Sequence, residues 1–127
     1  MSDVRKRILI VDDDADVCLS LKLALEIEGF DVQTARHGRE ALANASPVDL
    51  LITDLFMPEA DGFETIEGFR KLHPATRIIV VSGGAKQVKA DYMLVARVLG
   101  VDATFQKPVS PSVLSETIRT LLGTDRQ

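Results

Sequence analysis

The sequence predicts a single α/β domain in which a parallel sheet carries helices on both faces. Short apolar runs, typical of strands buried on both faces, alternate with segments whose apolar residues recur at helical spacing. Five such strand–helix units in a row favour a parallel sheet with a helical layer on each side. The length of 127 residues and the hydrophobic content of 46% suit one domain with its own core.

The first part of the chain gives two strand–helix units. Residues 7–11 contain four consecutive aliphatic side chains, which is typical of a strand that is buried on both faces. Residues 15–28 carry apolar side chains at helical spacing, and Gly29 favours the end of that helix. Residues 30–35 alternate weakly between apolar and polar side chains, which indicates a second strand. Residues 38–45 are expected to form a short helix that ends before a proline.

The middle of the chain repeats this alternation. Residues 49–53 and 77–82 are apolar runs typical of buried strands, and residues 103–106 are a shorter strand candidate. Residues 62–72 place their large apolar side chains on one helical face. Residues 87–99 are expected to form a further helix, although its apolar side chains lie on more than one face.

The last helix is predicted to begin at Ser110 and Pro111. Proline suits the first turn of a helix because its φ is already helical and its missing N–H needs no partner there. Residues 1–127 are therefore expected to form a single domain, with a core of about residues 6–122 and a short tail at residues 123–127.

The composition disfavours several classes of function. The net charge is −4 and no long basic run exists, which disfavours nucleic-acid binding. Cys18 is the only cysteine, so no internal disulfide can form, which fits a reducing compartment. No stretch approaches roughly 18 consecutive apolar residues, and the start of the sequence lacks the apolar segment of a signal peptide. We therefore expect a cytoplasmic protein that does not bind membranes.

Three consecutive aspartates, Asp12, Asp13 and Asp14, directly follow the first predicted strand. Parallel sheets bind their ligands at the carboxyl ends of their strands, so these side chains are expected where a site would form. Adjacent carboxylates repel one another, and a hard divalent cation between them would relieve that repulsion. Asp14 is also a candidate for a different role, the N-cap of the following helix.

Three further predicted strands also end in polar side chains. The third ends in Asp54, the fourth in Ser82 followed by Gly83 and Gly84, and the fifth in Lys107 followed by a proline. If the strands are parallel, these side chains meet the aspartates at one edge of the sheet. One carboxylate could then act as a nucleophile, while Ser82, Lys107 and the backbone of Gly83 hold a transferring phosphoryl group.

The order of these motifs resembles that of a response-regulator receiver domain of two-component signalling, over roughly residues 6–122. The motifs are Val11-Asp12-Asp13-Asp14, Asp54-Leu55-Phe56-Met57-Pro58, Asp61-Gly62, Ser82-Gly83 and Lys107-Pro108. Each motif alone is a weak signal, whereas all of them in this order and spacing are strongly specific. The resemblance implies a flavodoxin-like (βα)5 fold, a doubly wound parallel five-stranded sheet with the strand order 2-1-3-4-5.

The resemblance also implies roles for individual residues. Asp54 matches the phosphoacceptor, Ser82 matches the hydroxyl that bonds the phosphoryl oxygen, and Lys107 matches the lysine that pairs with the acceptor. The peptide bond between Lys107 and Pro108 is expected in the cis form. The Mg²⁺ ligands that the resemblance implies are Asp12, Asp13, Asp54 and the backbone carbonyl of Phe56.

The chain departs from the receiver pattern at Thr104. Receivers usually carry Tyr or Phe three residues before the lysine. Phe105 cannot replace that ring, because alternation along a strand places it on the opposite face. We therefore expect the response to phosphorylation to run through Ser82 and the loop from Gly83 to Lys89. The segment from Ser82 to Lys107 is also a few residues longer than is common in receivers, with the extra length expected at residues 84–90.

The helix at residues 87–99 offers a candidate surface for an output partner. Its apolar residues Tyr92, Met93 and Leu94 could make additional core contacts, or they could form an exposed patch that binds another protein.

Three hypotheses for function follow. The first is a single-domain response regulator that accepts a phosphoryl group on Asp54 from a histidine kinase with Mg²⁺, and signals through phosphorylation-dependent protein contacts. Such a protein is not a conventional enzyme, although it would catalyse its own phosphorylation and dephosphorylation. The second is a phosphorelay intermediate that passes phosphate to a histidine phosphotransfer protein, which Thr104 mildly favours. The third is a Mg²⁺-dependent phosphohydrolase with an aspartyl nucleophile. Asp12 and Asp14 formally match its motif, but Asp54 and Lys107 would be unexplained.

Overall fold

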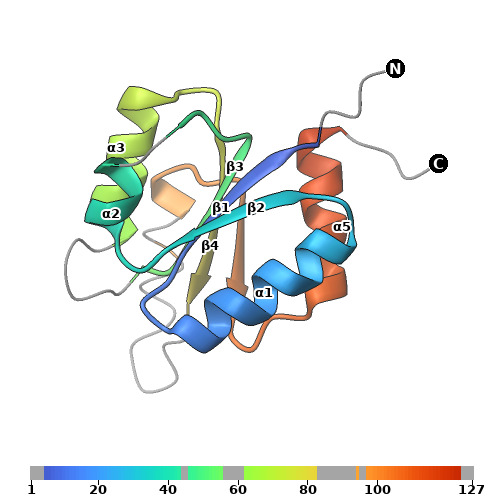
Figure 1. Ribbon diagram of the computed structural model, residues 1–127. Coiled ribbons are helices and arrows are strands. Elements are labelled where there is room, and N and C mark those ends of the chain that lie inside the picture. Colours follow the sequence, from blue (N-terminus) through green and yellow to red (C-terminus); the bar gives the residue numbers. More distant parts are fainter. Residues whose placement is uncertain (1–4, 44–45, 56–61, 83–93, 95–96, 124–127) are drawn as a thin grey trace.

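The computed structural model has one five-stranded parallel sheet with helices on both faces (Figure 1). It describes residues 5–43, 46–55, 62–82, 94 and 97–123. The elements are β1 (Arg7–Val11), α1 (Ala15–Ile27), β2 (Asp31–Ala35), α2 (Gly38–Ala43), β3 (Leu50–Thr53), α3 (Gly62–Leu72), β4 (Arg77–Ser82), β5 (Ala103–Gln106) and α5 (Pro111–Leu122).

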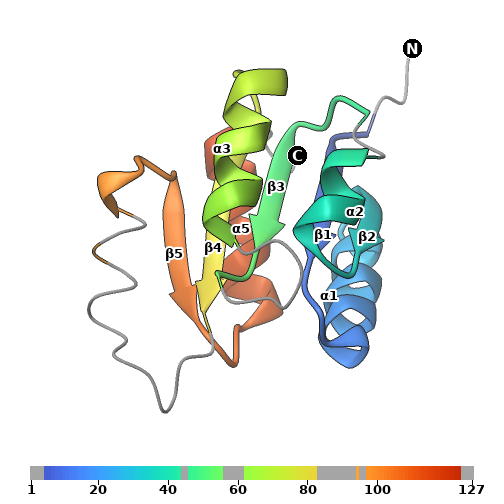
Figure 2. The ribbon, with the colours of Figure 1, turned by 90° about the vertical axis from the view of Figure 1, so that its left-hand side faces the viewer.

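The strand order is β2-β1-β3-β4-β5, and all four neighbouring pairs are parallel (Figure 2). This confirms the predicted fold class and strand order. Helices α1 and α5 cover one face of the sheet, and α2 and α3 cover the other (Figure 1). Since parallel strands share one direction, their carboxyl ends lie along a single edge, where polar side chains can gather.

The predicted bounds of β1, α3, β4 and β5 are confirmed, and those of α1, β2 and β3 differ from the structure by one residue. Helix α1 ends at Ile27, and Gly29 then adopts φ of +100°, a left-handed conformation that glycine tolerates best. Helix α2 is described from Gly38 to Ala43, and the last two residues of the predicted helix, 44–45, lie outside the described residues. The predicted helix at residues 87–99 lies mostly outside the described residues, although Leu94 and Val98 are helical.

Two hydrophobic layers hold the helices to the sheet. Alternate side chains of each strand point to opposite faces, so one apolar run supplies both layers. The layer under α1 and α5 contains Ile8, Ile10, Cys18, Leu21, Leu25, Phe30, Val32, Leu50, Ile52, Ile79, Val81, Leu114 and Ile118. The layer under α2 and α3 contains Leu9, Val11, Ala35, Ala41, Leu51, Leu55, Ile66, Phe69, Ile78 and Val80.

Two aspartates accept backbone hydrogen bonds at the amino-terminal ends of the strands. The Asp49 carboxylate accepts a hydrogen bond from the backbone N–H of Arg7 at 2.8 Å. The Asp102 carboxylate accepts one from the backbone N–H of Ile78 at 2.8 Å and also pairs with the Arg77 guanidinium at 3.1 Å. These bonds satisfy backbone donors at the strand starts. Among the residues that the structure describes, no helix is both long and apolar enough to cross a lipid bilayer.

Candidate functional site

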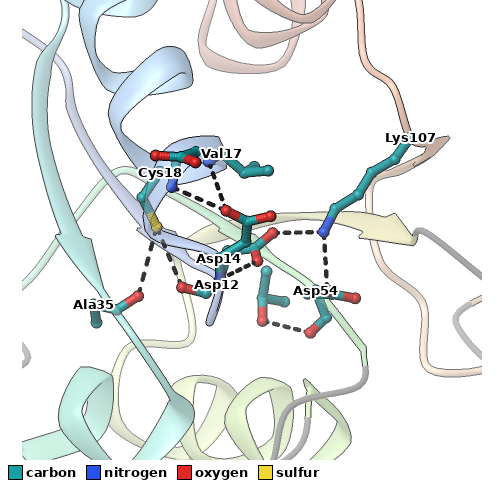
Figure 3. A network of polar contacts seen from close by, with 9 residues as sticks. Asp12, Asp14, Val17, Cys18, Ala35, Asp54 and Lys107 are labelled. Carbon is teal, nitrogen blue, oxygen red and sulfur yellow. Dashed lines mark hydrogen bonds and ion pairs between the residues drawn. The ribbon is translucent and has the colours of Figure 1, made fainter.

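The turn after β1 gives its aspartates different environments (Figure 3). The Asp14 carboxylate caps α1 by accepting hydrogen bonds from the backbone N–H groups of Asp16 at 2.9 Å and Val17 at 3.3 Å, as predicted. Asp12 is only 3% exposed, and its Oδ1 accepts a hydrogen bond from the backbone N–H of Asp14 at 2.9 Å. Asp13 is exposed. The capping role of Asp14 gives no support to the phosphohydrolase hypothesis, which needs that carboxylate at the nucleophile site.

Asp54 directly follows β3 and lies beside the β1 turn. Its backbone N–H donates to the Val11 carbonyl at 3.1 Å, which extends the contact between β1 and β3 by one residue. The residue is 8% exposed, so its carboxylate is largely withdrawn from water. A buried carboxylate needs a positive charge close to it, and here a lysine that follows another strand supplies that charge.

Lys107 links the two buried carboxylates. Its Nζ lies 2.8 Å from Oδ2 of Asp12 and 3.1 Å from Oδ2 of Asp54. Both contacts are drawn as dashed lines in Figure 3. The lysine follows β5, and its peptide bond to Pro108 is cis, as the resemblance implied. Burial lowers the pKa of Lys107, but its hydrogen bonds to Asp12 and Asp54 and their negative charges outweigh burial and leave the pKa above its usual value.

Three carboxylates could hold a metal ion together. Oxygen atoms from Asp12, Asp13 and Asp54 lie within 4.8 Å of one another. Hard divalent cations such as Mg²⁺ prefer oxygen ligands and usually retain several waters, which fits a site that combines two buried carboxylates with an exposed one. The acidic cluster therefore has the donor chemistry that Mg²⁺ requires.

A groove of about 580 Å³ borders Lys107. It lies between the first two turns of α1 and the segment after β5, and its lining includes Val17, Leu21 and Val109. Side chains that make up this lining are mostly apolar, which distinguishes the groove from the charged cluster beside it.

Several predicted site residues lie outside the described residues. These are Phe56, Gly83, Tyr92 and Met93. Ser82 is the last residue of β4 and pairs with Gln106, but its side chain is not described. Leu94 is 55% exposed, which fits a surface position.

The strand β5 alternates as expected. Phe105 packs against the layer under α1 and α5. Thr104 pairs with Val80, whose side chain belongs to the opposite layer. The side chain at position 104 therefore faces the side on which the receiver aromatic ring was expected, and Phe105 does not replace it.

Two residues to which the sequence analysis gave no role at the site touch the backbone of Asp54. The Thr53 hydroxyl, which is fully buried, donates to the Asp54 carbonyl at 2.8 Å. Gly62 packs against the same carbonyl. The available signal for the first was a hydroxyl at the end of an otherwise apolar strand, Leu50-Leu51-Ile52.

A family model described as the response regulator receiver domain matches residues 8–119. The chain belongs to this family. The transcriptional regulatory protein CpxR of Klebsiella pneumoniae is 34% identical over 117 residues, which are 91% of this chain and 49% of that protein. The alkaline phosphatase synthesis transcriptional regulatory protein PhoP of Bacillus subtilis is 33% identical over 121 residues, 94% of this chain and 49% of that protein. The chain thus spans about half the length of these relatives.

Solved receiver structures have the same fold. A CheY-like receiver domain protein from Methanospirillum hungatei is 34% identical, with a TM-score of 0.82 over 94% of this chain and 95% of that one. A receiver domain protein from Clostridium thermocellum is 28% identical, with a TM-score of 0.82 over 93% of this chain and 94% of that one. The chain is therefore a receiver domain of two-component signalling, a class of domain that receives its signal from sensor histidine kinases and binds Mg²⁺ at an acidic cluster.

Proposed function

We propose that this receiver domain accepts a phosphoryl group on Asp54 from the phosphohistidine of a sensor histidine kinase, and that it signals through phosphorylation-dependent protein contacts. The observation that carries the proposal is the Lys107 ammonium, which lies between the buried carboxylates of Asp54 and Asp12. The single-domain organisation over residues 1–127 and the cytoplasmic location stay predictions.

The proposed reaction is a transfer between two nucleophiles. A carboxylate oxygen of Asp54 forms the new bond to phosphorus while the bond from phosphorus to the histidine nitrogen of the donor breaks. Such transfers depend mainly on positioning and on charge neutralisation. The Lys107 ammonium would neutralise part of the negative charge that develops during the transfer, because it already lies 3.1 Å from the attacking carboxylate. When bound at the acidic cluster, Mg²⁺ would supply further positive charge toward the phosphoryl oxygens.

The geometry supports a division of labour within the acidic pair. Both Asp12 oxygens are occupied, one by the Asp14 N–H and the other by Lys107, so we propose that Asp12 acts on the metal mainly through water. Asp13 is exposed and is the proposed direct ligand beside Asp54. The proposed roles of Ser82, Gly83 and the Phe56 carbonyl, at the phosphoryl group and the metal, rest on the family alone.

The site also needs access for a protein donor. The apolar groove between α1 and the segment after β5 borders Lys107, so a kinase that buried apolar side chains there would bring its phosphohistidine close to Asp54. The exposed Leu94 supports the separate proposal of an output surface that includes Tyr92 and Met93.

The decisive experiment is mass spectrometry after incubation with a small phosphodonor and Mg²⁺. The wild type should gain the mass of one phosphoryl group, and Asp54→Asn should gain none. Asp49→Asn is the matched control, because Asp49 precedes the same strand at the opposite edge of the sheet and should leave the gain unchanged. A persisting gain in Asp54→Asn would refute the assignment.

A phosphorelay intermediate is the second candidate, and Thr104 is the observation that favours it. The side chain at this position has no ring to bury, and a domain that only passes phosphate onward needs less conformational response. Adding a histidine phosphotransfer protein separates the candidates. Rapid loss of the phosphoryl group to that protein favours the relay, whereas a partner that binds only the phosphorylated form favours the regulator.

A further inference from the structure

The backbone of Asp54 is held on both sides, although the residue lies beyond the regular sheet. The paired registers of β3 with β1 and with β4 both end at Thr53. The Asp54 N–H still reaches the Val11 carbonyl at 3.1 Å. On the other side, the Asp54 carbonyl accepts a hydrogen bond from the Thr53 hydroxyl at 2.8 Å. Both peptide groups of Asp54 therefore have a fixed orientation.

The Thr53 side chain is fully buried, and its partners on the neighbouring strands, Val11 and Val80, belong to the hydrophobic layer under α2 and α3. A valine would have the same branched shape and would suit a buried strand as well, but it would offer no donor. Burying a hydroxyl costs free energy unless it forms a hydrogen bond, and here the bond goes to the carbonyl of Asp54. The hydroxyl therefore contributes something to Asp54 that packing alone does not.

Gly62 closes on the same carbonyl from the start of α3. Its N–H donates to the Leu55 carbonyl at 2.9 Å. A Cβ atom at position 62 would lie 2.3 Å from the Asp54 carbonyl oxygen and 2.6 Å from Cα of Leu55. Non-bonded heavy atoms do not approach so closely, and both neighbours are backbone atoms, so any larger residue would displace the chain around Asp54.

We propose that Thr53 and Gly62 are positioning residues for phosphoryl transfer, because together they fix the peptide group after Asp54 and so direct its carboxylate toward Lys107. The inference rests on the proposed role of Asp54 as phosphoacceptor. Phosphoryl transfer relies largely on positioning, and a displacement of 1 Å in a reacting group costs roughly 100-fold in rate. Loss of one of two backbone anchors should cost less than that, and we expect a loss of about tenfold.

The first test compares Thr53→Val with Thr53→Ser. The rate of the mass gain with a small phosphodonor and Mg²⁺ should fall about tenfold in Thr53→Val. It should stay within about threefold of wild type in Thr53→Ser, which keeps the hydroxyl but loses the branch. The Mg²⁺ affinity, measured without phosphodonor, should weaken in Thr53→Val as well, since Asp54 is a proposed ligand. A wild-type rate and affinity in Thr53→Val would overturn the inference, because a purely structural role is satisfied by valine.

The second test compares two glycines of the same helix. Gly62→Ala should lower the phosphorylation rate at least as strongly as Thr53→Val. Gly68→Ala also adds a methyl group in a tight position, but the three nearest atoms all belong to the flexible Leu42 side chain, the closest at 2.7 Å, and not to the backbone of Asp54. The rate of folded Gly68→Ala should therefore be that of the wild type. Equal rates for the two folded alanine variants would refute the role of Gly62.

The two tests remain informative if one variant does not fold, because each pair changes a different element next to the same carbonyl. They also separate this inference from the proposed function. If Asp54→Asn still gains a phosphoryl group, the proposed function fails. If only Asp54 is phosphorylated and Thr53→Val reacts like the wild type, the proposed function stands and the positioning role fails.

Discussion

Replacing Lys107 by methionine removes the positive charge from the centre of the site while keeping a side chain of similar length. In the native protein the Lys107 ammonium lies 2.8 Å and 3.1 Å from two carboxylates whose side chains are only 5% and 10% exposed. Without the ammonium, Asp12 and Asp54 would face each other with no cation between them. Lys107→Met should therefore lower the free energy of unfolding when no divalent cation is present.

The size of the effect follows from these distances. At an effective dielectric constant of about 20, each ion pair contributes about 5 to 6 kcal/mol of gross attraction. Most of that is offset by the desolvation of the three groups, and measured losses on breaking buried pairs are about 3 to 5 kcal/mol. Because Lys107 is partly exposed, with 23% of its side chain accessible, we expect a loss near the lower limit, about 3 kcal/mol. For a domain of this size that is a fall in Tm on the order of 10 °C.

Thermal unfolding in EDTA and in Mg²⁺ tests this expectation. Lys22→Met is the matched control, because Lys22 forms an ion pair with Glu26 on the surface of α1, where such pairs contribute about 0 to 1 kcal/mol. Mg²⁺ should raise the Tm of Lys107→Met more than that of the wild type, since the ammonium no longer opposes the cation. If Lys107→Met and Lys22→Met have the same Tm in EDTA, Lys107 does not neutralise the buried carboxylates.

Three further outcomes follow from the site and its surroundings. Asp13→Ala should abolish Mg²⁺ binding measured by calorimetry, and an unchanged Mg²⁺ affinity would exclude Asp13 as a ligand. Because the variant has less repulsion among the clustered carboxylates, its free energy of unfolding without metal should rise by up to about 1 kcal/mol. Burial, followed by the Asp12 charge, raises the pKa of Cys18 to about 11 from 9.0. The protonated thiol should therefore make its full contribution to the free energy of unfolding below pH 9 and lose it as the pH rises toward 11. Denaturant titrations across this pH range should show the loss in the wild type and not in Cys18→Ala. An acyl-phosphate mimic with Mg²⁺ should change hydrogen exchange in residues 83–95 more than in residues 104–120, and the reverse pattern would exclude a response through the loop after Ser82.

The fold class and the cluster of charges could be predicted because both follow from local patterns, whereas the strand order was implied by the resemblance to receiver domains. Apolar runs and helical spacing give the order of elements, and parallel strands bring Asp12, Asp54 and Lys107 to one edge. The N-cap role of Asp14 was also predicted, since capping depends on side-chain type and position alone.

The contacts around the Asp54 carbonyl could not be predicted, because they depend on the path of the backbone after the strand ends. Thr53 suits a strand by propensity, and nothing local indicates that its hydroxyl donates to the next carbonyl. Gly62 was quoted only as part of the Asp61-Gly62 motif, whereas the structure shows that the close approach of the Asp54 and Leu55 backbone leaves no room for a Cβ atom there.

The carboxylates of Asp49 and Asp102 have a consequence for engineering this domain. They accept backbone hydrogen bonds where the strands begin, whereas every proposed reactive group lies where the strands finish. The contacts that stabilise the sheet and the proposed reactive groups thus lie at opposite ends of the same strands. Substitutions around Arg7, Asp49 and Asp102 offer a way to adjust the melting behaviour of the domain while the chemistry at Asp54 is left untouched.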